Sequence, residues 1–509
     1  MVAKLIDGDR HLSGQEVMAR ATRIAGGLDA MGIGQGSVVA LLLRNDARFF
    51  EAMIACRLVG AYHCPINWHF KGEETAHILG DSGAKLLIAH TDLLAAVASS
   101  LPPGLAIIAV TPSAPLIEAY RIAPGLTRVA APYQEWERFI EASPVFSGEG
   151  RSPLGLMPYS SGTTGRPKGI RRARPSPQNL VDMAELSRIT LGIEPGMRTA
   201  TPAPLYHSAP NTHGLNAVLQ GDLIVIEPRF EAERLLADIE RHRLTSLYLV
   251  PTMFVRLLKL PPEVKRRYDL SSLTYVVTAG APCAPEIKDA MIEWWGPIVN
   301  ETYGASETGL VTFCTAQEAR ARPGTVGRFM PWARGLILDD EGHELPVREI
   351  GTVYCNVTVI PDFTYANNEA ARLAIERDGL IGVGDMGYVD EEGYLFLCDR
   401  KVDMVISGGV NIYPAEIEAA LITAPGVLDC AVFGIPDPEY GEALMAYIEP
   451  QPGTRPDAEE IRRYLSRKLA DYKVPRRIEL ADTLPRDDSG KIFKRRLREP
   501  YWRNAGRRI

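Results

Sequence analysis

Short apolar runs of strand length alternate with amphipathic helical segments along the chain. Leu223–Ile226, Ser246–Val250 and Thr274–Thr278 are predicted strands, and Glu231–His242 and Thr252–Leu258 are predicted helices between them. Strands that are apolar on both faces and separated by helices are typical of a parallel sheet covered on both sides. We therefore predict an α/β fold that binds its ligands in the loops at the carboxyl ends of the strands.

The same alternation begins near the N-terminus. Ser13 and Glu16 form a predicted capping box, and apolar residues at helical spacing follow them. Val38–Leu43 and Lys85–Ala89 are predicted strands, and Arg48–Gly60 is a predicted helix. These segments indicate doubly wound sheets from the first residues onward.

The length of 509 residues exceeds what one hydrophobic core serves. The pattern changes after Asp399, where helical and strand-like segments mix within about 110 residues. These segments are Pro414–Ile422, Val427–Val432, Ala443–Ile448 and Ala458–Leu469. We expect two domains, residues 1–398 and 399–509, the second being a small α+β unit.

Composition excludes several classes of protein. Lys and Arg number 56 against 63 Asp and Glu, a net charge of −7, which gives no global reason to bind nucleic acid. The 7 cysteines form no Cys-x-x-Cys pair, so neither a zinc site nor a disulfide framework is expected. No signal peptide or membrane-spanning run is apparent. We expect a soluble cytoplasmic protein without integral membrane association or a nucleic-acid partner.

Charge is unevenly distributed. Ile461–Ile509 holds sixteen Lys and Arg against six Asp and Glu, a net charge of +10, and the rest of the chain carries −17. A solvated surface is the plainer interpretation of such a basic segment. A phosphate-handling module is the alternative.

The densest functional signal is the run Tyr159–Gly169, which reads YSSGTTGRPKG. Its glycines allow the backbone to approach a phosphate, and its hydroxyls and amides are donors to phosphate oxygens. A nucleotide P-loop is excluded, because Pro167 stands where its second glycine belongs and Gly169 replaces the Ser or Thr after Lys168. A phosphate loop of another kind, or a plain surface loop, remains.

This run closely resembles the phosphate loop of the adenylate-forming superfamily, which includes acyl-CoA synthetases, nonribosomal peptide synthetase adenylation domains and firefly luciferase. Further segments resemble that superfamily's motifs in the same order along nearly the whole chain. They are Pro204–His207, Ala279–Pro282, Asn300–Thr308, Gly384-Asp385, Asp399–Gly409 and Pro485–Lys491. The chain is most similar to bacterial acyl-CoA synthetases for fatty or steroid-type acids. The resemblance implies a large N-terminal domain with a small β-barrel-like part, and a small C-terminal domain that moves about a hinge near Asp399.

The resemblance implies an ATP and AMP site. Tyr303 would stack on adenine, Asp385 would accept hydrogen bonds from both ribose hydroxyls, Arg400 would lie at the ribose or phosphate, and Lys168 would meet the β- and γ-phosphates. The full implied set is Ser160, Ser161, Gly162, Thr163, Thr164, Gly165, Lys168, Gly280, Ala281, Pro282, Thr302, Tyr303, Gly304, Ser306, Asp385, Arg400 and Lys491. Four of these residues also have a purely structural interpretation: Tyr303 as a core tyrosine, Asp385 as a turn residue, Arg400 as a solvated hinge residue and Lys168 as a solvated lysine.

Catalytic and metal roles follow from the same motifs. Glu307, with Thr163, is the implied ligand set for Mg²⁺, which prefers hard oxygen ligands together with phosphate and water. His207 is implied to close the acyl pocket and to gate thioester formation, with simple packing as its alternative. Lys491 is implied to contact the substrate carboxylate and the α-phosphate together. We therefore predict Lys491, His207 and Glu307 as the catalytic residues.

The reaction implied is ligation of an acid to coenzyme A in two steps, with ATP, Mg²⁺ and CoA required. The acid is first converted to acyl-AMP with release of pyrophosphate, and the acyl group then passes to CoA along the turn formed by Ser407, Gly408 and Gly409. Transfer to a carrier protein and a catalytically inactive nucleotide-binding homologue are the alternatives. Homodimers are common in this superfamily.

Two departures and the acyl-site sequence complete the prediction. Ser306 stands where Thr is more frequent, and Arg171, Arg172 and Arg174 form an unusually basic stretch, favoured as a solvated loop over a phosphate or CoA path. The segments 208–214 and 249–253 carry no acidic residue that could pair with a substrate amine. An apolar acid of medium or long fatty, aryl or steroid type is therefore favoured.

Overall fold

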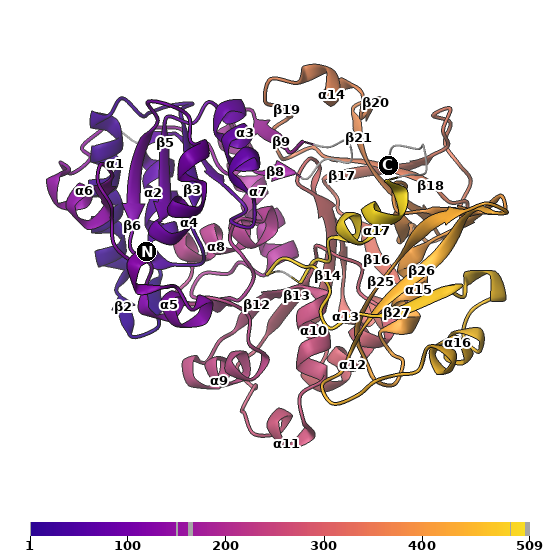
Figure 1. The fold of residues 1–509 in the computed structure, drawn as a ribbon. Helices are drawn as coiled ribbons and strands as arrows, with labels where there is room; N and C mark the ends of the chain where they lie inside the picture. Colours follow the sequence, from indigo (N-terminus) through magenta and orange to yellow (C-terminus); the bar gives the residue numbers. More distant parts are fainter. Residues whose placement is uncertain (1, 149–150, 161–165, 489, 504–509) are drawn as a thin grey trace.

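The computed structural model of the chain describes residues 2–148, 151–160, 166–488 and 490–503. Figure 1 shows an N-terminal α/β part, a second α/β part that continues into twisted antiparallel strands, and a small C-terminal part packed against them. Among the described residues no helix is both long and apolar enough to cross a membrane.

A five-stranded sheet in the order β4-β3-β5-β6-β7 forms the centre of the N-terminal part, and all of its strands are parallel. Its strands are β3 (Val38–Leu42), β4 (Tyr62–Pro65), β5 (Leu86–His90), β6 (Ala106–Val110) and β7 (Gln134–Glu135). Alternate residues of β3 enter two different cores: Val39 and Leu41 one, Ala40 and Leu42 the other. Both faces are therefore buried, as the apolar strand runs predict.

Helices cover the two faces of this sheet. The first core includes residues of α1 (Gly14–Ala30), α2 (Ala47–Val59) and α6 (Trp136–Ala142). The second core includes residues of α3 (Gly72–Ser82) and α4 (Thr91–Val97). The predicted capping box at Ser13 and Glu16 is present at the start of α1.

The remaining strands of the large part form three further sheets. A four-stranded sheet has the order β10-β11-β1-β2, a three-stranded one β19-β9-β8, and a ten-stranded one runs from β12 to β17. The strands of the two smaller sheets are β1 (Lys4–Asp7), β2 (Arg10–Leu12), β8 (Tyr159–Ser160), β9 (Lys168–Arg172), β10 (Arg198–Thr201), β11 (Leu223–Ile226) and β19 (Phe363–Tyr365). The ten-stranded sheet comprises β12 (Ser246–Leu249), β13 (Tyr275–Thr278), β14 (Val299–Ala305), β15 (Gly309–Cys314), β16 (Thr325–Phe329), β17 (Ala333–Leu338), β18 (Gly351–Val357), β20 (Glu376–Arg377), β21 (Leu380–Val389) and β22 (Tyr394–Arg400).

The ten-stranded sheet departs from the predicted parallel arrangement. β12, β13 and β14 are parallel, but every pairing after β14 is antiparallel. Antiparallel neighbours need no crossover helix, so the regular helix-strand alternation is lost in this half of the sheet, where the short helices α13 (Ala316–Ala321) and α14 (Glu369–Leu373) stand between strands. The expected β-barrel-like part is not a closed barrel, because the described strands follow an open path from β12 to β17 with β20 beside β21.

The helices of the large part for which a range was predicted lie close to that range. For example, α9 (Ala232–His242) and α10 (Pro251–Leu258) each begin within one residue of the predicted start. No range was predicted for the remaining helices, which are α5 (Ala114–Tyr120), α7 (Pro177–Leu191), α8 (Ser208–Gln220), α11 (Pro262–Lys265), α12 (Pro285–Trp295), α13 (Ala316–Ala321) and α14 (Glu369–Leu373).

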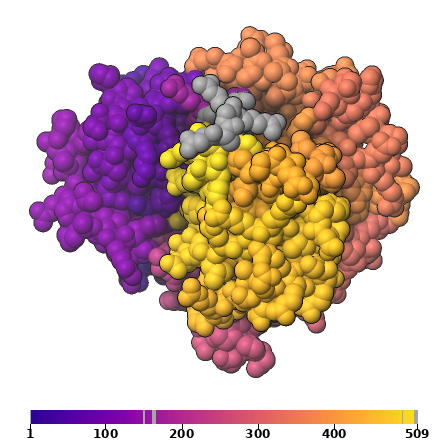
Figure 2. Space-filling view, turned by 45° about the vertical axis from the view of Figure 1, so that its right-hand side comes forward, coloured from indigo at the N-terminus to yellow at the C-terminus, as the bar shows by residue number. Residues whose placement is uncertain are grey.

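The C-terminal part has its own sheet and core, as an α+β unit requires. The sheet has the order β24-β23-β26-β25, and β27 adds to β26 in parallel. Its elements are β23 (Val405–Ser407), β24 (Val410–Ile412), α15 (Pro414–Leu421), β25 (Val427–Asp437), β26 (Gly441–Pro450), α16 (Ala458–Ser466), β27 (Arg477–Leu480) and α17 (Lys494–Trp502). Figure 2 shows this yellow part seated in front of the junction between the N-terminal part and the antiparallel strands.

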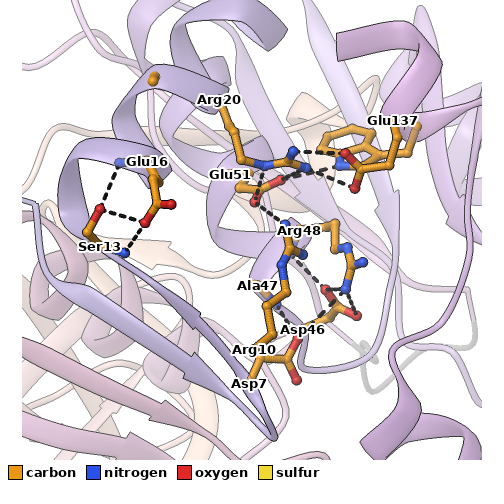
Figure 3. A network of polar contacts seen from close by, with 12 residues as sticks. Asp7, Arg10, Ser13, Glu16, Arg20, Asp46, Ala47, Arg48, Glu51 and Glu137 are labelled. Atoms are coloured by element: carbon orange, nitrogen blue, oxygen red, sulfur yellow. Dashed lines mark hydrogen bonds and ion pairs between the residues drawn. The ribbon is translucent and has the colours of Figure 1, made fainter. Parts of the chain in front are cut away.

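A partly buried polar network joins α1, α2, α6 and β1 (Figure 3). The guanidinium of Arg20 donates to Glu51 at 2.8 Å and to Glu137 at 2.8 Å. Below it, Asp7 and Asp46 share the guanidinium of Arg48. Burial and the neighbouring Asp46 carboxylate raise the pKa of Asp7 to about 7, against the pull of Arg48. The network fixes the packing of the helices on one face of the five-stranded sheet.

Candidate active site

A cavity of about 1710 Å³ lies where the large and the C-terminal parts meet. Its walls include predicted residues from six of the seven motifs. These are Ser160, Lys168, His207, Gly280, Gly304, Ser306, Glu307, Arg400 and Lys491. Residues Ser161, Gly162, Thr163, Thr164 and Gly165 lie outside the described residues. The structure therefore brings about half of the predicted residues that it describes to one cavity.

Tyr303, Asp385 and Arg400 come from three strands and meet at one carboxylate. The hydroxyl of Tyr303 in β14 donates to Oδ2 of Asp385 in β21 at 2.7 Å. Nε of Arg400 in β22 donates to Oδ1 at 3.3 Å, and Asp385 and Arg400 are paired in the ladder. Burial and the carboxylate raise the pKa of Tyr303, so its hydroxyl keeps its proton. Each carboxylate oxygen retains a further acceptor position for a ligand hydroxyl.

The turn between β14 and β15 carries the predicted metal ligand. Glu307 is buried, and its Oε1 accepts a hydrogen bond of 3.0 Å from the hydroxyl of Tyr365. The ammonium of Lys168 lies 5.1 Å from the centre of the Tyr365 ring. The hydroxyls of Ser306 and Ser208 are 2.7 Å apart. Side chains of the phosphate loop and the Glu307 turn are thus joined through one aromatic ring.

Glu307 is the only predicted metal ligand within the described residues, which contain no cluster of three His, Cys, Asp or Glu side chains suited to a metal ion. Mg²⁺ is usually held by one or two carboxylates together with phosphate oxygens and water rather than by a cage of protein ligands. A buried carboxylate in the cavity wall fits that requirement. The second predicted ligand, Thr163, lies outside the described residues.

Arg172 corrects the prediction of a solvated basic loop. Its guanidinium donates to the carbonyls of Ser306 at 2.8 Å, Glu307 at 2.7 Å and Pro361 at 2.9 Å. Burial lowers the pKa of Arg172 to about 10, although Glu307 opposes this. Arg171 and Arg174 are exposed as predicted. Sequence reasoning missed Arg172 because its three acceptors are backbone carbonyls from distant segments, which leave no trace in the sequence.

Lys491 enters the cavity from a tight turn of the C-terminal part. The amide of Gly490 donates to the carbonyl of Asp487, and the amide of Lys491 donates to Oδ1 of Asp487 at 3.1 Å. Gly490 has φ +87°, and a Cβ there would lie 2.3 Å from Oγ1 of Thr252, so the turn needs glycine. Lys491 keeps contact with solvent in the cavity, yet the protein atoms crowded around it and the charge of Arg400 lower the pKa of its ammonium.

His207 contacts the same turn. It stands at the N-cap of α8, and its Nε2 lies 3.0 Å from Oδ2 of Asp487. The ring of Tyr206 is tilted against it at 4.4 Å. His207 is therefore more than a packing residue, because it joins the acyl-pocket segment to the turn that carries Lys491.

Other predicted residues have different surroundings. Thr302 is buried, and its hydroxyl donates to the carbonyl of Thr312, which is a role within the sheet. Ala281 and Pro282 are exposed in the loop after β13, beside Gly280. Asp385 itself is absent from the cavity wall, although Gly384 and Arg400 are in it.

The predicted CoA residues form the turn between β23 and β24. Gly408 and Gly409 have φ +58° and +80°, and the amide of Gly408 donates to the carbonyl of Tyr440. Ser407, Gly408 and Gly409 do not line the cavity, although their neighbours Ile406 and Glu442 do. In this structure Lys491 occupies the cavity and the glycine turn stands outside it.

Comparison with known proteins identifies the family. Residues 2–357 match the family model described as AMP-binding enzyme, and residues 416–491 match that of the AMP-binding enzyme C-terminal domain. The chain belongs to the AMP-binding enzyme family. The superfamily predicted from the motifs is thereby confirmed, and the chain is an AMP-forming acid–thiol ligase that binds ATP or AMP.

Relatives with known names cover nearly the whole chain. A feruloyl-CoA synthase of Amycolatopsis sp is 32% identical over 497 residues, covering 97% of this chain and 95% of the relative. A fatty acid–[acyl-carrier-protein] ligase, ScoC of Streptomyces coeruleorubidus, is 30% identical, covering 100% and 95%. The structure of o-succinylbenzoate CoA synthetase (MenE) from Bacillus subtilis with its acyl-adenylate intermediate has a TM-score of 0.78 at 27% identity, covering 97% and 95%.

Proposed function

We propose that the chain is an ATP-dependent acyl-CoA synthetase that activates an apolar carboxylic acid as acyl-AMP and then transfers the acyl group to CoA. The observation that carries the proposal is the meeting of Lys491, Arg400 and Glu307 in one cavity, although they come from different parts of the chain. A site that binds a nucleotide and a carboxylic acid needs cations for the phosphates and the acid, and a carboxylate that can hold Mg²⁺.

In the first step a carboxylate oxygen of the acid attacks the α-phosphorus of ATP, and the bond from that phosphorus to the pyrophosphate oxygen breaks. Pyrophosphate leaves with the electron pair, and acyl-AMP remains. Lys491 would stabilise the charge shared by the carboxylate and the α-phosphate, and Lys168 the charge on the leaving group. The pKa of Lys491 is lowered because the surrounding protein atoms reduce the hydration of its ammonium. Less water must therefore be removed before the ammonium contacts an anion.

Mg²⁺, when bound, would supply neutralisation of phosphate charge. Glu307 would hold it, with Thr163 as the second predicted ligand. Tyr365 donates to Glu307 and Arg172 binds the carbonyls of the same turn, so both would keep the carboxylate aimed into the cavity. The ring of Tyr303 and the carboxylate of Asp385 would hold adenine and ribose.

In the second step the CoA thiol attacks the acyl carbonyl, loses its proton, and AMP leaves. We place the hinge for a change of orientation at Asp399, as the boundary between residues 1–398 and 399–509. Oδ1 of Asp399 accepts from the amide of Arg400 at 2.7 Å, and Oδ2 accepts from the amide of Ala415 at the start of α15 at 2.8 Å. Rotation there would remove Lys491 and bring Ser407, Gly408 and Gly409 to the cavity.

An apolar substrate is supported by the cavity wall that α7 and α8 provide. Its large apolar residues include Leu180, Met183, Leu186, Leu191, Leu215 and Leu219, and no acidic residue of α7 or α8 lines the cavity. A substrate amine would find no carboxylate on this wall. An acid with an alkyl, aryl or steroid-type body would exclude water from it.

A carrier protein as acceptor is the second candidate. The likeness to ScoC, a fatty acid–[acyl-carrier-protein] ligase, favours it. The first step would then be unchanged, and only the thiol would differ. An inactive homologue is disfavoured by the presence of Lys168, Glu307 and Lys491 in the same cavity.

The test is a panel of acids graded in length and width, offered with MgATP and either CoA or a phosphopantetheinylated carrier protein. We expect acid-dependent pyrophosphate release, and AMP release that requires CoA. If AMP is released with the carrier protein but not with CoA, the carrier protein is the acceptor. Absence of pyrophosphate release with every acid would contradict the proposed function.

A further inference from the structure

Two adjacent carboxylates, Asp487 and Asp488, lie just before Lys491 and contact side chains of the large part of the chain. Asp487 is buried and Asp488 is half-buried, so neither is a freely solvated charge. Their surroundings are four ring side chains with a polar atom at the tip, which we call the ring cradle. The ring cradle consists of His69, Tyr120, Tyr206 and His207.

Asp487 is held from the acyl-pocket side. Nε2 of His207 lies 3.0 Å from its Oδ2. The ring of Tyr206 lies beside that of His207, with 4.4 Å between their centres. Burial, and after it the carboxylates of Asp487 and Asp488, raise the pKa of Tyr206, so its hydroxyl stays protonated. A protonated hydroxyl and an imidazole both offer donors to the acidic pair.

Asp488 is held from the other side. Its Oδ2 lies 3.0 Å from the hydroxyl of Tyr120, and the single proton of that hydroxyl is also within reach of the carbonyl of Pro228 at 2.9 Å. Its Oδ1 lies 3.7 Å from Nε2 of His69, a buried nitrogen with no hydrogen-bond partner within the described residues. Tyr120 and Asp488 are 368 positions apart, so the contact is a tertiary one between the two parts.

The rings of the cradle are also held by contacts that do not involve the acidic pair. Trp68 stacks on His69 at 3.8 Å and meets the edge of Tyr120 at 5.4 Å. The guanidinium of Arg44 lies 4.4 Å from the ring of Tyr120 and is itself bound to Asp92 at 2.8 Å. Such packing fixes the direction of the polar tips.

The contacts pass directly to Lys491. Oδ1 of Asp487 accepts from the amide of Lys491, while Oδ2 faces His207. One carboxylate thus joins the lysine turn to the large part. Without donors around them, two carboxylates beside a triphosphate site would repel the substrate.

We propose that the ring cradle positions Lys491 by holding Asp487 and Asp488, and so supports acyl-AMP formation but not transfer of the acyl group to the thiol. This rests on the proposed function. Tyr120 and Asp488 are positioning residues, since they act through the turn and do not line the cavity.

The test compares Tyr120→Phe, Asp488→Ala and the double variant with wild type. Acyl-AMP formation is followed by acid-dependent exchange of pyrophosphate into ATP, and transfer by thioester formation from synthetic acyl-adenylate. We expect each single variant to slow the exchange about tenfold, the double variant to be no slower than the slower single one, and transfer to stay unchanged. Asp488→Asn should recover part of the loss, because its amide oxygen still accepts from Tyr120. Asp482→Asn, an exposed change on the preceding loop, is the matched control.

A second measurement does not depend on activity. Hydrogen exchange of the amides of residues 485–493 should be at least tenfold faster in Asp488→Ala, with β25 unchanged. Equal loss in both half-reactions, additive effects or unchanged exchange of that segment would overturn the ring-cradle proposal. A wild-type protein that exchanges no pyrophosphate with any acid would contradict the proposed function instead, and the hydrogen exchange would still decide on the cradle.

Discussion

The hydroxyl of Tyr303 donates a hydrogen bond of 2.7 Å to Asp385, a residue 82 positions later in the sequence. The bond links β14 to β21 across the antiparallel half of the ten-stranded sheet. Arg400 binds the other oxygen of the same carboxylate. The predicted adenine-stacking residue, ribose carboxylate and hinge arginine are therefore one connected unit rather than three separate contacts.

Asp385→Ala should raise the apparent KM for ATP strongly without unfolding the protein. Loss of two charge-assisted hydrogen bonds to ribose should cost about 2–4 kcal/mol, about 30- to 800-fold in KM. Tyr303→Phe keeps the ring and removes only the bond to Asp385, so its effect should be smaller. The measurement is steady-state pyrophosphate release against ATP concentration, and an unaltered KM in folded Asp385→Ala would refute the ribose role.

The glycine turn should serve only the second step. Gly409→Leu is compared with Gly453→Leu, because both glycines belong to the C-terminal part, have φ near +80°, and have no atoms within 4 Å of an added Cβ. Both changes should lower the melting temperature alike, since a side chain is strained at such a φ. Only Gly409→Leu should slow thioester formation from acyl-adenylate. If Gly453→Leu slows it equally, the turn has no special relation to CoA.

The buried pair of Lys288 in α12 and Glu301 in β14 should stabilise the strand that carries Tyr303. Lys288→Met leaves the Glu301 carboxylate buried without its partner and should cost about 3–5 kcal/mol of unfolding free energy. Lys288→Met/Glu301→Leu should recover most of it. Urea unfolding measures both, and a double variant as unstable as the single one would show that the residues matter through packing alone.

Stability should depend on pH through Asp7. Its pKa is about 7 in the folded protein and 3.8 ordinarily, so between these values the folded protein retains a proton that the unfolded chain releases. This contribution to stability is full below about pH 4 and is lost as pH rises to about 7. Asp7→Asn lacks that slope. Between pH 5 and pH 8 the melting temperature of Asp7→Asn should rise relative to that of wild type. A constant difference between the two melting temperatures across this range would contradict the raised pKa of Asp7.

The sequence predicted local elements well where the pattern is local. β11 at Leu223–Ile226 agrees with its prediction at both ends, because four consecutive apolar residues define a doubly buried strand. The sequence pattern did not separate the antiparallel strands from β15 to β22 from the parallel ones, because they are half-exposed and no crossover helices connect them. The motifs identified Tyr303, Asp385 and Lys491 as candidates, and the structure shows which of them touch.

The contacts among motifs could not be predicted in the same way. Asp487 meets His207 and Asp488 meets Tyr120 only because the C-terminal part packs against the large part. Tyr120 ends a short helix without any motif, so nothing in its neighbourhood marks it. Arg172 looked like one member of a basic run, and only burial against three carbonyls separates it from Arg171.

Lys491→Ala tests the central claim, that the lysine in the cavity drives acid activation and then leaves. Quenched-flow with labelled ATP times acyl-AMP formation, and a second mixing with synthetic acyl-adenylate and CoA times the transfer. Removal of one preorganised charge should slow the first by about 10²–10³, while transfer stays close to the wild-type rate. A loss of the same size in both half-reactions would contradict the account.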